Sequence, residues 1–414
     1  MAVNPGYKQT ELGVIPDTWE FGSLGRFWSV TDCKHVTAQF VHQGFPLASI
    51  REVQSRFVDL TNAKQTTASF YKLLIEGGRK PRPGDMLLSR NATVGEVAQV
   101  ADWHPQFAMG QDVCLLRKKS NEYSTEFLQA VFQSPVILNQ LSDLMVGSTF
   151  KRVNVQQIRN FVVPMPPPPE QRSIATALSD VDGLLDALKR LIAKKRDLKQ
   201  GAMQQLLTGQ TRLPGFQGEW EMRTLADLAD IRSGGTPSTT ESKFWDGDIP
   251  WCTPTDITAL DGHKYLTETS RRITDHGLKS CSAEMIPANS IVMTSRATIG
   301  ECAINTAPIS TNQGFKNFVP YQHVDVDFLY YLLTKQKQGF ISLCGGSTFL
   351  EIGKGQLVTY EVRLPVDKAE QTAIATVLGD MDAELAALEQ RLAKTRVLKQ
   401  GMMQELLTGR TRLL

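Results

Sequence analysis

The chain has 414 residues, of which 41% are hydrophobic and 21% are charged, and its formal net charge is +2. Two to four domains are expected at this length, and the composition is typical of a soluble globular protein. With so little net charge, any basic surface has to come from local clustering of Lys and Arg. No signal-peptide core and no long apolar run occur, so we predict a cytoplasmic protein without a membrane span.

The cysteine and histidine spacings argue against a metal or redox site. None of the six cysteines has a C-x-x-C partner, and the six histidines are scattered along the chain. A zinc knuckle or a dithiol motif needs closer spacing. We therefore expect free thiols, as in a reducing cytosol, and neither a bound metal nor a cofactor.

Residues 1–165 are expected to form a first mixed α/β domain. Short β-like runs such as GDMLLSR and EVAQVA are bounded by Gly and Pro, and STEFLQAVFQS has a helical pattern. The polar segments TDCKHVT, SRNAT and GSTFKR carry Arg, Lys, Asn and hydroxyl groups, which can bind base edges or phosphates. The residues predicted to bind DNA here are Thr31, Lys34, His35, Thr37, Arg90, Asn91, Ser148, Thr149, Lys151 and Arg152.

Residues 166–211 are predicted to form a long helix, of roughly 57 Å for about 38 residues. PMPPPP blocks helix upstream, and Gly209 is a natural stop. Acidic residues crowd the first half and basic residues the second, which suits the helix dipole. The heptad pattern breaks at Lys195 and Lys199, which predicts that a coiled coil loosens or changes partner there. The apolar residues of this heptad pattern are Ile174, Leu178, Val181, Leu185, Leu188 and Ile192.

Residues 212–364 are expected to form a second mixed α/β domain, with short motifs at places that correspond to those of the first. SIVMTSR and ECAIN are β-like, and DVDFLYYLLTKQ is helix-like. The loop SGGTPST stands where TDCKHVT stands in the first domain, SRATIGE answers SRNATVGE, and GSTF recurs. The residues predicted to bind DNA here are Ser233, Gly235, Thr236, Ser238, Thr239, Arg296, Thr298, Ser347 and Thr348.

Residues 365–414 repeat the first helix. Glu170–Leu213 aligns without a gap with Glu370–Leu413, and 27 of 44 positions are identical. LPVDKAEQ replaces MPPPPEQ before the second copy, which predicts a less rigid start. A heptad stripe has to be buried, and the other copy is the nearest partner, so we predict an antiparallel intramolecular coiled coil. In the alternative, each helix packs separately on its own domain.

The predicted fold class is therefore α+β. Two mixed α/β domains are separated by two long helices that form an intramolecular antiparallel coiled coil, in a pseudo-two-fold repeat. The helices are alike and the domains differ, which indicates a function with fixed geometry and two different recognition tasks.

No catalytic motif stands out in the sequence. A P-loop, a dinucleotide loop, H-E-x-x-H and G-x-S-x-G are all missing. Glu241 and Lys243 form a nuclease-like E-x-K, a triplet that commonly arises by chance. The pattern favours a binding or scaffolding protein over an enzyme.

Some of the predicted site residues have a structural alternative. Arg90 and Arg296 could anchor a turn after a strand, each satisfied by a carboxylate such as Glu96 or Glu301, and GSTF could be a structural turn. The loops TDCKHVT and SGGTPST have the stronger functional reading, because they occupy equivalent places with different side chains.

Taken together, PPPPEQ, the repeated LKQGxMQxLLTGxTRL, SGGTPS, DCKH and GSTF resemble the specificity subunit of a Type I restriction–modification system over nearly the whole chain. The resemblance implies two target recognition domains that each read half of a split double-stranded DNA sequence. It implies that the helices set the distance between the half-sites and help to dock two modification subunits, which carry the S-adenosylmethionine site and the methylation chemistry.

The same resemblance implies that restriction subunits with ATP-driven translocation and cleavage join the complex, and that this chain is not itself catalytic. Two other readings stay open at this point. One is a scaffold whose coiled coil pairs two protein-binding domains without DNA. The other is a fused methyltransferase or nuclease with unrecognised motifs.

Overall fold

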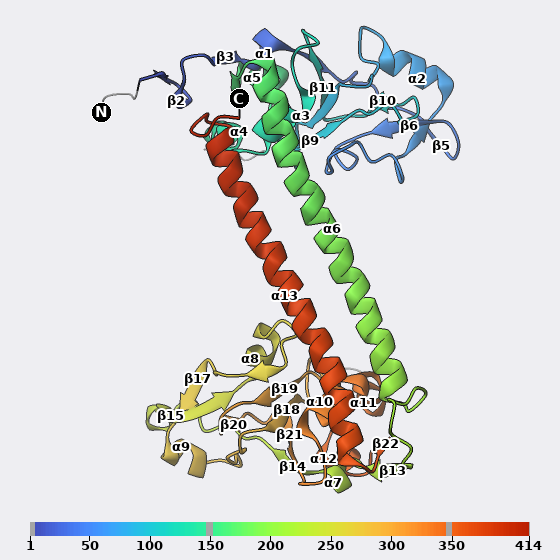
Figure 1. Cartoon of the computed structure of the whole chain (residues 1–414), viewed down its shortest axis with the longest axis vertical. Helices are drawn as coiled ribbons and strands as arrows, with labels where there is room; N and C mark the ends of the chain where they lie inside the picture. The colour runs from blue at the N-terminus through green and yellow to red at the C-terminus, as the bar shows by residue number, and fades with distance from the viewer. Residues whose placement is uncertain (1–4, 146–151, 345–349, 414) are drawn as a thin grey trace. The chain divides into compact units, whose positions relative to one another are not determined.

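The computed structural model describes residues 5–145, 152–344 and 350–413. The chain divides into two compact units: unit 1 holds residues 1–189 and 390–414, and unit 2 holds residues 190–389. Figure 1 draws both units, coloured along the chain. Each unit takes in one part of each long helix. The units therefore cross the predicted borders between domains and helical regions, and those borders stay predictions.

The main sheet of unit 1 has four antiparallel strands in the order β4-β11-β8-β9. Leu88 and Leu116 belong to one core cluster, whereas their neighbours Leu87 and Leu115 belong to another. Alternate side chains of a strand point to opposite faces, so this sheet is covered on both faces. The strands are β4 (Trp28–Asp32), β8 (Met86–Ser89), β9 (Val97–Gln99) and β11 (Val113–Lys118).

A second, smaller sheet of unit 1 has the order β10-β6-β7-β5, and two strand pairs complete the unit. The predicted helix in STEFLQAVFQS is confirmed as α3, and its first turn is capped by the Ser124 hydroxyl. The remaining strands are β1 (Tyr7–Thr10), β2 (Gly13–Pro16), β3 (Glu20–Ser23), β5 (Phe40–Val41), β6 (Phe45–Ala48), β7 (Gln65–Thr66), β10 (Ala108–Met109) and β12 (Val162–Met165). The short helices are α1 (Leu24–Phe27), α2 (Ala68–Ile75), α3 (Thr125–Phe132), α4 (Pro135–Met145) and α5 (Val155–Asn160).

Unit 2 repeats this frame with other side chains. Its main sheet has the order β14-β21-β18-β19-β16, so β14, β21, β18 and β19 correspond to β4, β11, β8 and β9. The strands are β13 (Trp220–Thr224), β14 (Ala229–Ser233), β15 (Trp245–Cys252), β16 (Tyr265–Leu266), β17 (Arg271–Ile273), β18 (Ser290–Thr294), β19 (Cys302–Asn305), β20 (Ser310–Thr311), β21 (Phe315–Pro320) and β22 (Glu361–Pro365). The helices are α7 (Leu225–Leu228), η1 (Ser242–Phe244), α8 (Pro254–Ala259), α9 (Asp275–Lys279), α10 (Val326–Lys335), α11 (Lys337–Leu343) and α12 (Lys354–Val358).

The two long helices are α6 (Pro168–Leu206) and α13 (Lys368–Leu406), each of 39 residues. Proline is compatible with the first turn of a helix, because the amide hydrogens there have no partner within the helix. In the second copy the residue just before the helix is Asp367, whose side chain accepts a hydrogen bond from the Ala369 amide at 2.8 Å. Gly209 and Gly409 follow the two helix ends at φ +71° and +72°, as expected of C-terminal stops. In the described residues, no helix combines the length and apolar character needed to cross a bilayer.

Within each unit, the start of one long helix packs against the end of the other. In unit 1, Lys399 of α13 lies 2.6 Å from Asp182 of α6. In unit 2, Lys195 lies 2.7 Å from Glu384, and Lys199 is paired with Asp382. Partner numbers fall along α13 as they rise along α6, so the predicted antiparallel coiled coil is confirmed.

The coil was expected to loosen or change partner at Lys195 and Lys199, and the expected loosening is wrong. Both lysines lie in the helix pair of unit 2 and bind carboxylates of α13. Asp382 also accepts a hydrogen bond from the Tyr331 hydroxyl of α10 at 2.6 Å. The heptad pattern counts only apolar residues, whereas here ion pairs continue the contact.

A buried glutamate lies at the start of each long helix. Glu170 is 2% exposed and accepts hydrogen bonds from the Trp19 indole at 2.9 Å and from the Arg412 guanidinium at 2.5 and 2.8 Å. Glu370, at 1% exposure, is bound in the same way by Trp220 and Arg212. These contacts join the start of one helix, the segment after the other helix and the domain of the same unit.

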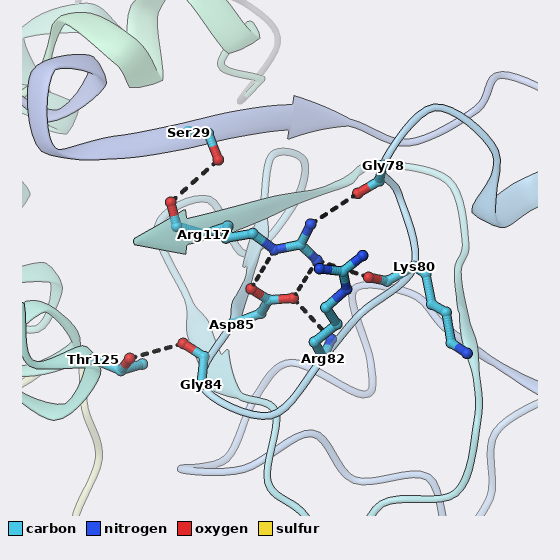
Figure 2. A network of polar contacts seen from close by, with 8 residues as sticks. All are labelled: Ser29, Gly78, Lys80, Arg82, Gly84, Asp85, Arg117 and Thr125. Carbon is cyan, nitrogen blue, oxygen red and sulfur yellow. Dashed lines mark hydrogen bonds and ion pairs between the residues drawn. The ribbon is translucent and has the colours of Figure 1, made fainter. Parts of the chain in front are cut away.

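An ion pair between half-buried Arg117 and buried Asp85 fixes the loop that leads into β8 of unit 1. The guanidinium of Arg117, on β11, donates to both carboxylate oxygens of Asp85 at 2.7 and 2.8 Å (Figure 2). It also donates to the carbonyls of Gly78 and Lys80, as Figure 2 shows. Because all of these acceptors lie before β8, the pair holds this loop against the strand at the centre of the sheet.

We expect Arg412→Met to lower the free energy of unfolding by about 3–5 kcal/mol, because it leaves the carboxylate of Glu170 buried without its cation. Thermal or urea unfolding of the full chain measures this. Arg410→Met is the matched control, because Arg410 is exposed and only 3.6 Å from Glu405. Its effect should stay within about 0.5 kcal/mol. Equal effects of the two variants would contradict the role of Glu170.

Candidate nucleic-acid interface

Three polar segments of unit 1 meet at one end of its main sheet, which we call the loop edge of unit 1. The end of β4 is paired with the start of β11 through Asp32 and Cys114. The end of β8 is paired with the same part of β11 through Ser89 and Val113. The loop after β4 and the turn after β8 therefore lie at the same edge. The fold brings together most of the residues that the sequence singled out in the first domain.

Arg90 is buried at this edge. It is only 3% exposed, and its guanidinium lies 2.7 Å from the Asp32 carboxylate and 4.0 Å from the Cys33 sulfur. The expected partner Glu96 was wrong, since Glu96 is exposed and Asp32 takes this place. A cation buried beside a carboxylate is neutralised there, so the structure favours the anchoring alternative for Arg90. A DNA contact of Arg90 stays an untested prediction.

The loop after β4 presents more accessible side chains. His35 and Thr37 are exposed, and Thr31 and Lys34 are half-buried. The His35 imidazole lies 3.3 Å from Asp32, and Lys34 forms an ion pair with Glu76. Among the predicted residues of this loop, His35 and Thr37 are therefore the ones open to a ligand.

The turn after β8 and the segment before α5 form the rest of the loop edge of unit 1. Asn91 and Arg152 form a β-bridge, and both side chains approach Asp112, at 3.4 and 3.1 Å. Arg152 is 51% exposed. The predicted residues Ser148, Thr149 and Lys151 lie outside the described residues.

A cation would have possible ligands in Asp32, Cys33 and His35, whose ligand atoms lie within 4.8 Å of one another. However, the guanidinium of Arg90 contacts both Asp32 and Cys33. Burial, together with the Asp32 charge, raises the pKa of the Cys33 thiol, which opposes the thiolate that a metal needs. The arrangement is better explained as a charge pair than as a metal centre.

The loop edge of unit 2 has the same strand frame and other chemistry. Ser233, at the end of β14, is paired with Lys316 of β21, and Thr294 of β18 is paired with Phe315. Lys316 is 7% exposed. Lys316 is not among the residues predicted from the sequence, although a lysine inside the apolar run FKNFVP is a visible signal.

The two glycines after β14 are packed against neighbouring backbone. A Cβ on Gly234 would lie 1.9 Å from the Asn312 carbonyl oxygen, and one on Gly235 would lie 2.4 Å from the Ala283 amide nitrogen. The Gly235 amide donates to the Thr311 carbonyl at 2.9 Å, and the Gly235 carbonyl accepts from the Trp251 indole at 3.0 Å. Gly235 therefore fixes the loop, and a ligand would meet the residues that follow it.

The chain after these glycines becomes exposed beyond buried Pro237. The half-buried Thr236 is hydrogen-bonded to Gln313, and Ser238 and Thr239 are exposed. The Ser238 carbonyl accepts from the Trp245 indole at 3.0 Å, which leaves its hydroxyl at the surface, 2.8 Å from that of Thr240. Half-buried Ser233 closes the strand.

The turn after β18 has the same backbone geometry as the turn after β8. When the two turns are aligned by this geometry, their Ser-Arg pairs are shifted by one residue relative to each other. The Thr93 amide donates to Asn91 and the Thr298 amide to Arg296, both at 2.6 Å. The residue between them is an alanine with positive φ in each case, 57° in one unit and 55° in the other. Arg296 therefore corresponds to Asn91, and Ser295 corresponds to Arg90.

Arg296 and Thr298 are exposed, unlike Arg90. The Arg296 guanidinium lies 2.9 Å from Glu351, and the two residues form a β-bridge. The expected partner Glu301 was wrong, because Glu301 is paired with Lys337. The predicted residues Ser347 and Thr348 lie outside the described residues.

Two stretches of the chain, residues 54–195 and 217–395, match the family model of the Type I restriction modification DNA specificity domain. The chain belongs to this family. The match includes most of both units, and it confirms the resemblance drawn from the sequence motifs.

Curated proteins of the family are similar to this chain. The putative type I restriction enzyme MjaX specificity subunit of Methanocaldococcus jannaschii is 25% identical, covering 98% of this chain and 96% of that protein. The MjaIX specificity subunit of the same organism is 39% identical over 166 residues, which cover 40% of this chain and 38% of that protein. The EcoR124I/EcoR124II specificity subunit of Escherichia coli is 24% identical, covering 64% of this chain and 66% of that protein.

Solved structures of the family show the same fold. The HsdS subunit from Thermoanaerobacter tengcongensis has a TM-score of 0.53 at 19% identity, over 96% of this chain and 98% of that one. The S subunit from M. genitalium has a TM-score of 0.56 at 15% identity, over 98% of both chains. A chain from a study of complex assembly in the type I R-M system has a TM-score of 0.64 at 20% identity, over 96% of this chain and 99% of that one.

We expect Gly234→Ala to destabilise unit 2 by about 1–3 kcal/mol, because the new Cβ meets backbone atoms that have little freedom to move. Thermal unfolding of the full chain measures this effect. Gly218→Ala is the matched control in the same unit, since a Cβ there has no neighbour within 4 Å. Equal melting temperatures of the two variants would contradict a stabilising role for the close packing of this loop.

Proposed function

We propose that this chain is the DNA-reading subunit of a Type I restriction–modification complex. Each unit would read one half of a bipartite double-stranded target with its loop edge. The observation that carries the proposal is that one strand frame occurs twice with different polar groups at the same edge. Unit 1 offers His35 and Asn91, whereas unit 2 offers Ser238 and Arg296. Two readers of different base sequences require this combination of a common frame and unlike side chains.

The long helices support a role in spacing the two half-sites. Each is continuous over 39 residues, which corresponds to about 58 Å at 1.5 Å per residue. Neighbouring half-sites on one face of a duplex lie roughly 34 Å apart, or one helical turn. Helices of this length are sufficient to span such a distance.

Partner proteins would dock on the helices, in the reading we propose. The helix parts of unit 1 expose Leu184 and Leu398, and those of unit 2 expose Leu191 and Leu198. Exposed apolar side chains on a helix face are typical of binding surfaces when they recur. Two modification subunits, which hold S-adenosylmethionine and methylate adenine, and the restriction subunits are the expected partners. The chain itself would be non-catalytic and would act in the cytoplasm of its host.

The scaffold alternative has less support. It accounts for the paired helices but gives no reason for the polar loop edges, and the family match is to DNA specificity domains. A scaffold would also be indifferent to DNA, which separates the two readings.

Deleting the gene for this chain should remove one bipartite methylated adenine motif from the host genome, and restoring it should return the same motif. Long-read sequencing of modified bases measures this. An unchanged set of methylated motifs after deletion would contradict the proposal.

Surface variants should divide by half-site. His35→Ala should relax recognition of one half, and Ser238→Ala recognition of the other, each by about 1–3 kcal/mol for a lost base contact. Both residues are exposed, so neither variant should unfold the chain. Selection of binding sites from random DNA by the assembled complex measures the preference at each position. Loss of preference in both halves with either variant would contradict the division of labour.

A further inference from the structure

Unit 2 contains a buried lysine at its loop edge that is paired with no carboxylate in the described part of the chain. Lys316 is the second residue of β21 and is paired with Ser233 on one side and Met293 on the other. It is 7% exposed, and its ammonium donates to the Phe315 carbonyl at 3.3 Å. In the described residues, no side-chain carboxylate lies within ion-pair distance of it, and the residues outside these ranges include no Asp or Glu.

The charged groups that act on the Lys316 ammonium are one carboxylate and two cations. Arg296, Lys354 and Glu351 act on its ammonium, and the only carboxylate among them, that of Glu351, is bound by Arg296 at 2.9 Å. Three cations therefore share one carboxylate. This excess of positive charge is suited to an anion.

The corresponding place in unit 1 is neutral. Cys114 stands at the second position of β11 and is paired with Asp32, as Lys316 is paired with Ser233. The buried cation of that edge is Arg90, which lies 2.7 Å from the Asp32 carboxylate. In unit 2 the position of Arg90 is taken by Ser295, whose hydroxyl is buried without a hydrogen-bond partner in the described residues. The two edges therefore share a frame and differ in whether the cation is compensated.

A buried ammonium without a counter-ion destabilises the folded protein. Burial lowers the pKa of Lys316, as expected when water is removed from a charged group. Buried charged groups without a partner are concentrated at functional sites, where a ligand supplies the partner that offsets the free energy of burial.

We propose that Lys316 binds a phosphate of the DNA backbone at the half-site read by unit 2. The inference rests on the proposed function and adds a named anchor to it. A lysine ammonium is a compact point charge with three donors, which suits a phosphate. Arg296 and Lys354 add positive potential around the same phosphate. Unit 1, with its cation neutralised, would hold its half-site by other contacts.

The test is Lys316→Met in the full chain assembled with its modification subunits. The probe is a duplex that carries the methylated motif, and its dissociation constant is measured over a series of salt concentrations. A lost phosphate contact should weaken binding at low salt and reduce the slope of log affinity against log salt by about one. The methylated motif should stay the same, and the melting temperature should be equal to or higher than that of the wild type.

Lys368→Met is the matched control, because it removes one lysine from the same unit. Lys368 is exposed and donates to the Gln322 carbonyl, just beyond the end of β21 opposite to Lys316. Its salt slope should equal that of the wild type. If Lys316→Met does not assemble, Lys316→Cys introduces the residue that unit 1 has at the same place, and the same change of slope is expected.

An unchanged salt slope in the Lys316 variants would overturn the inference while leaving the proposed function intact. An unchanged slope with altered bases in one half-site would also overturn it, because Lys316 would then read a base. A wild-type assembly that binds no duplex would overturn the proposed function itself.

Discussion

The structure depends on one buried carboxylate at the start of each long helix. Glu170 and Glu370 each accept hydrogen bonds from an indole and a guanidinium. A buried carboxylate is tolerated only when such partners surround it. The arginine comes from beyond the end of the opposite helix, so the contact forms only when the helices run antiparallel. The glutamine after each of these glutamates also joins the helix to the domain. Gln171 and Gln371 each donate to a carbonyl before the helix and accept from a backbone amide of the neighbouring domain.

These contacts leave the loop edges free to differ. The central strands of each unit are held by apolar residues on both faces, and buried loop residues such as Cys33 and Phe107 join that core while exposed loop residues do not. The edge of unit 1 contains an ion pair of buried Arg90 with Asp32, and the edge of unit 2 has close-packed glycines and a buried lysine without a carboxylate partner among the described residues. One frame can thus present two unlike surfaces, which is the requirement for reading two unlike half-sites.

The sequence predicted the location of the loop edges better than the role of each side chain. TDCKHVT and SGGTPST do end corresponding strands. Aligning the two Ser-Arg pairs gave the wrong correspondence between the turns. The alanine at positive φ defines each turn, and Arg90 lies two residues before it whereas Arg296 lies one residue before it. Arg90 is buried and Arg296 is exposed for this reason. Partners such as Asp32 and Glu351 come from distant segments, and no local pattern indicates them.

By itself, the sequence determined the repeat, the two helices with their glycine stops, and the strands, because these depend on periodicity and on local backbone preference. It also determined the family, through the repeated helix ends and GSTF together with motifs such as DCKH and SGGTPS that each occur once. Only the tertiary structure decided which charges are neutralised. Whether a lysine or an arginine meets a carboxylate depends on strands and turns brought together from far apart in the chain, and a one-residue change of register in a turn moves a side chain from the surface to the interior.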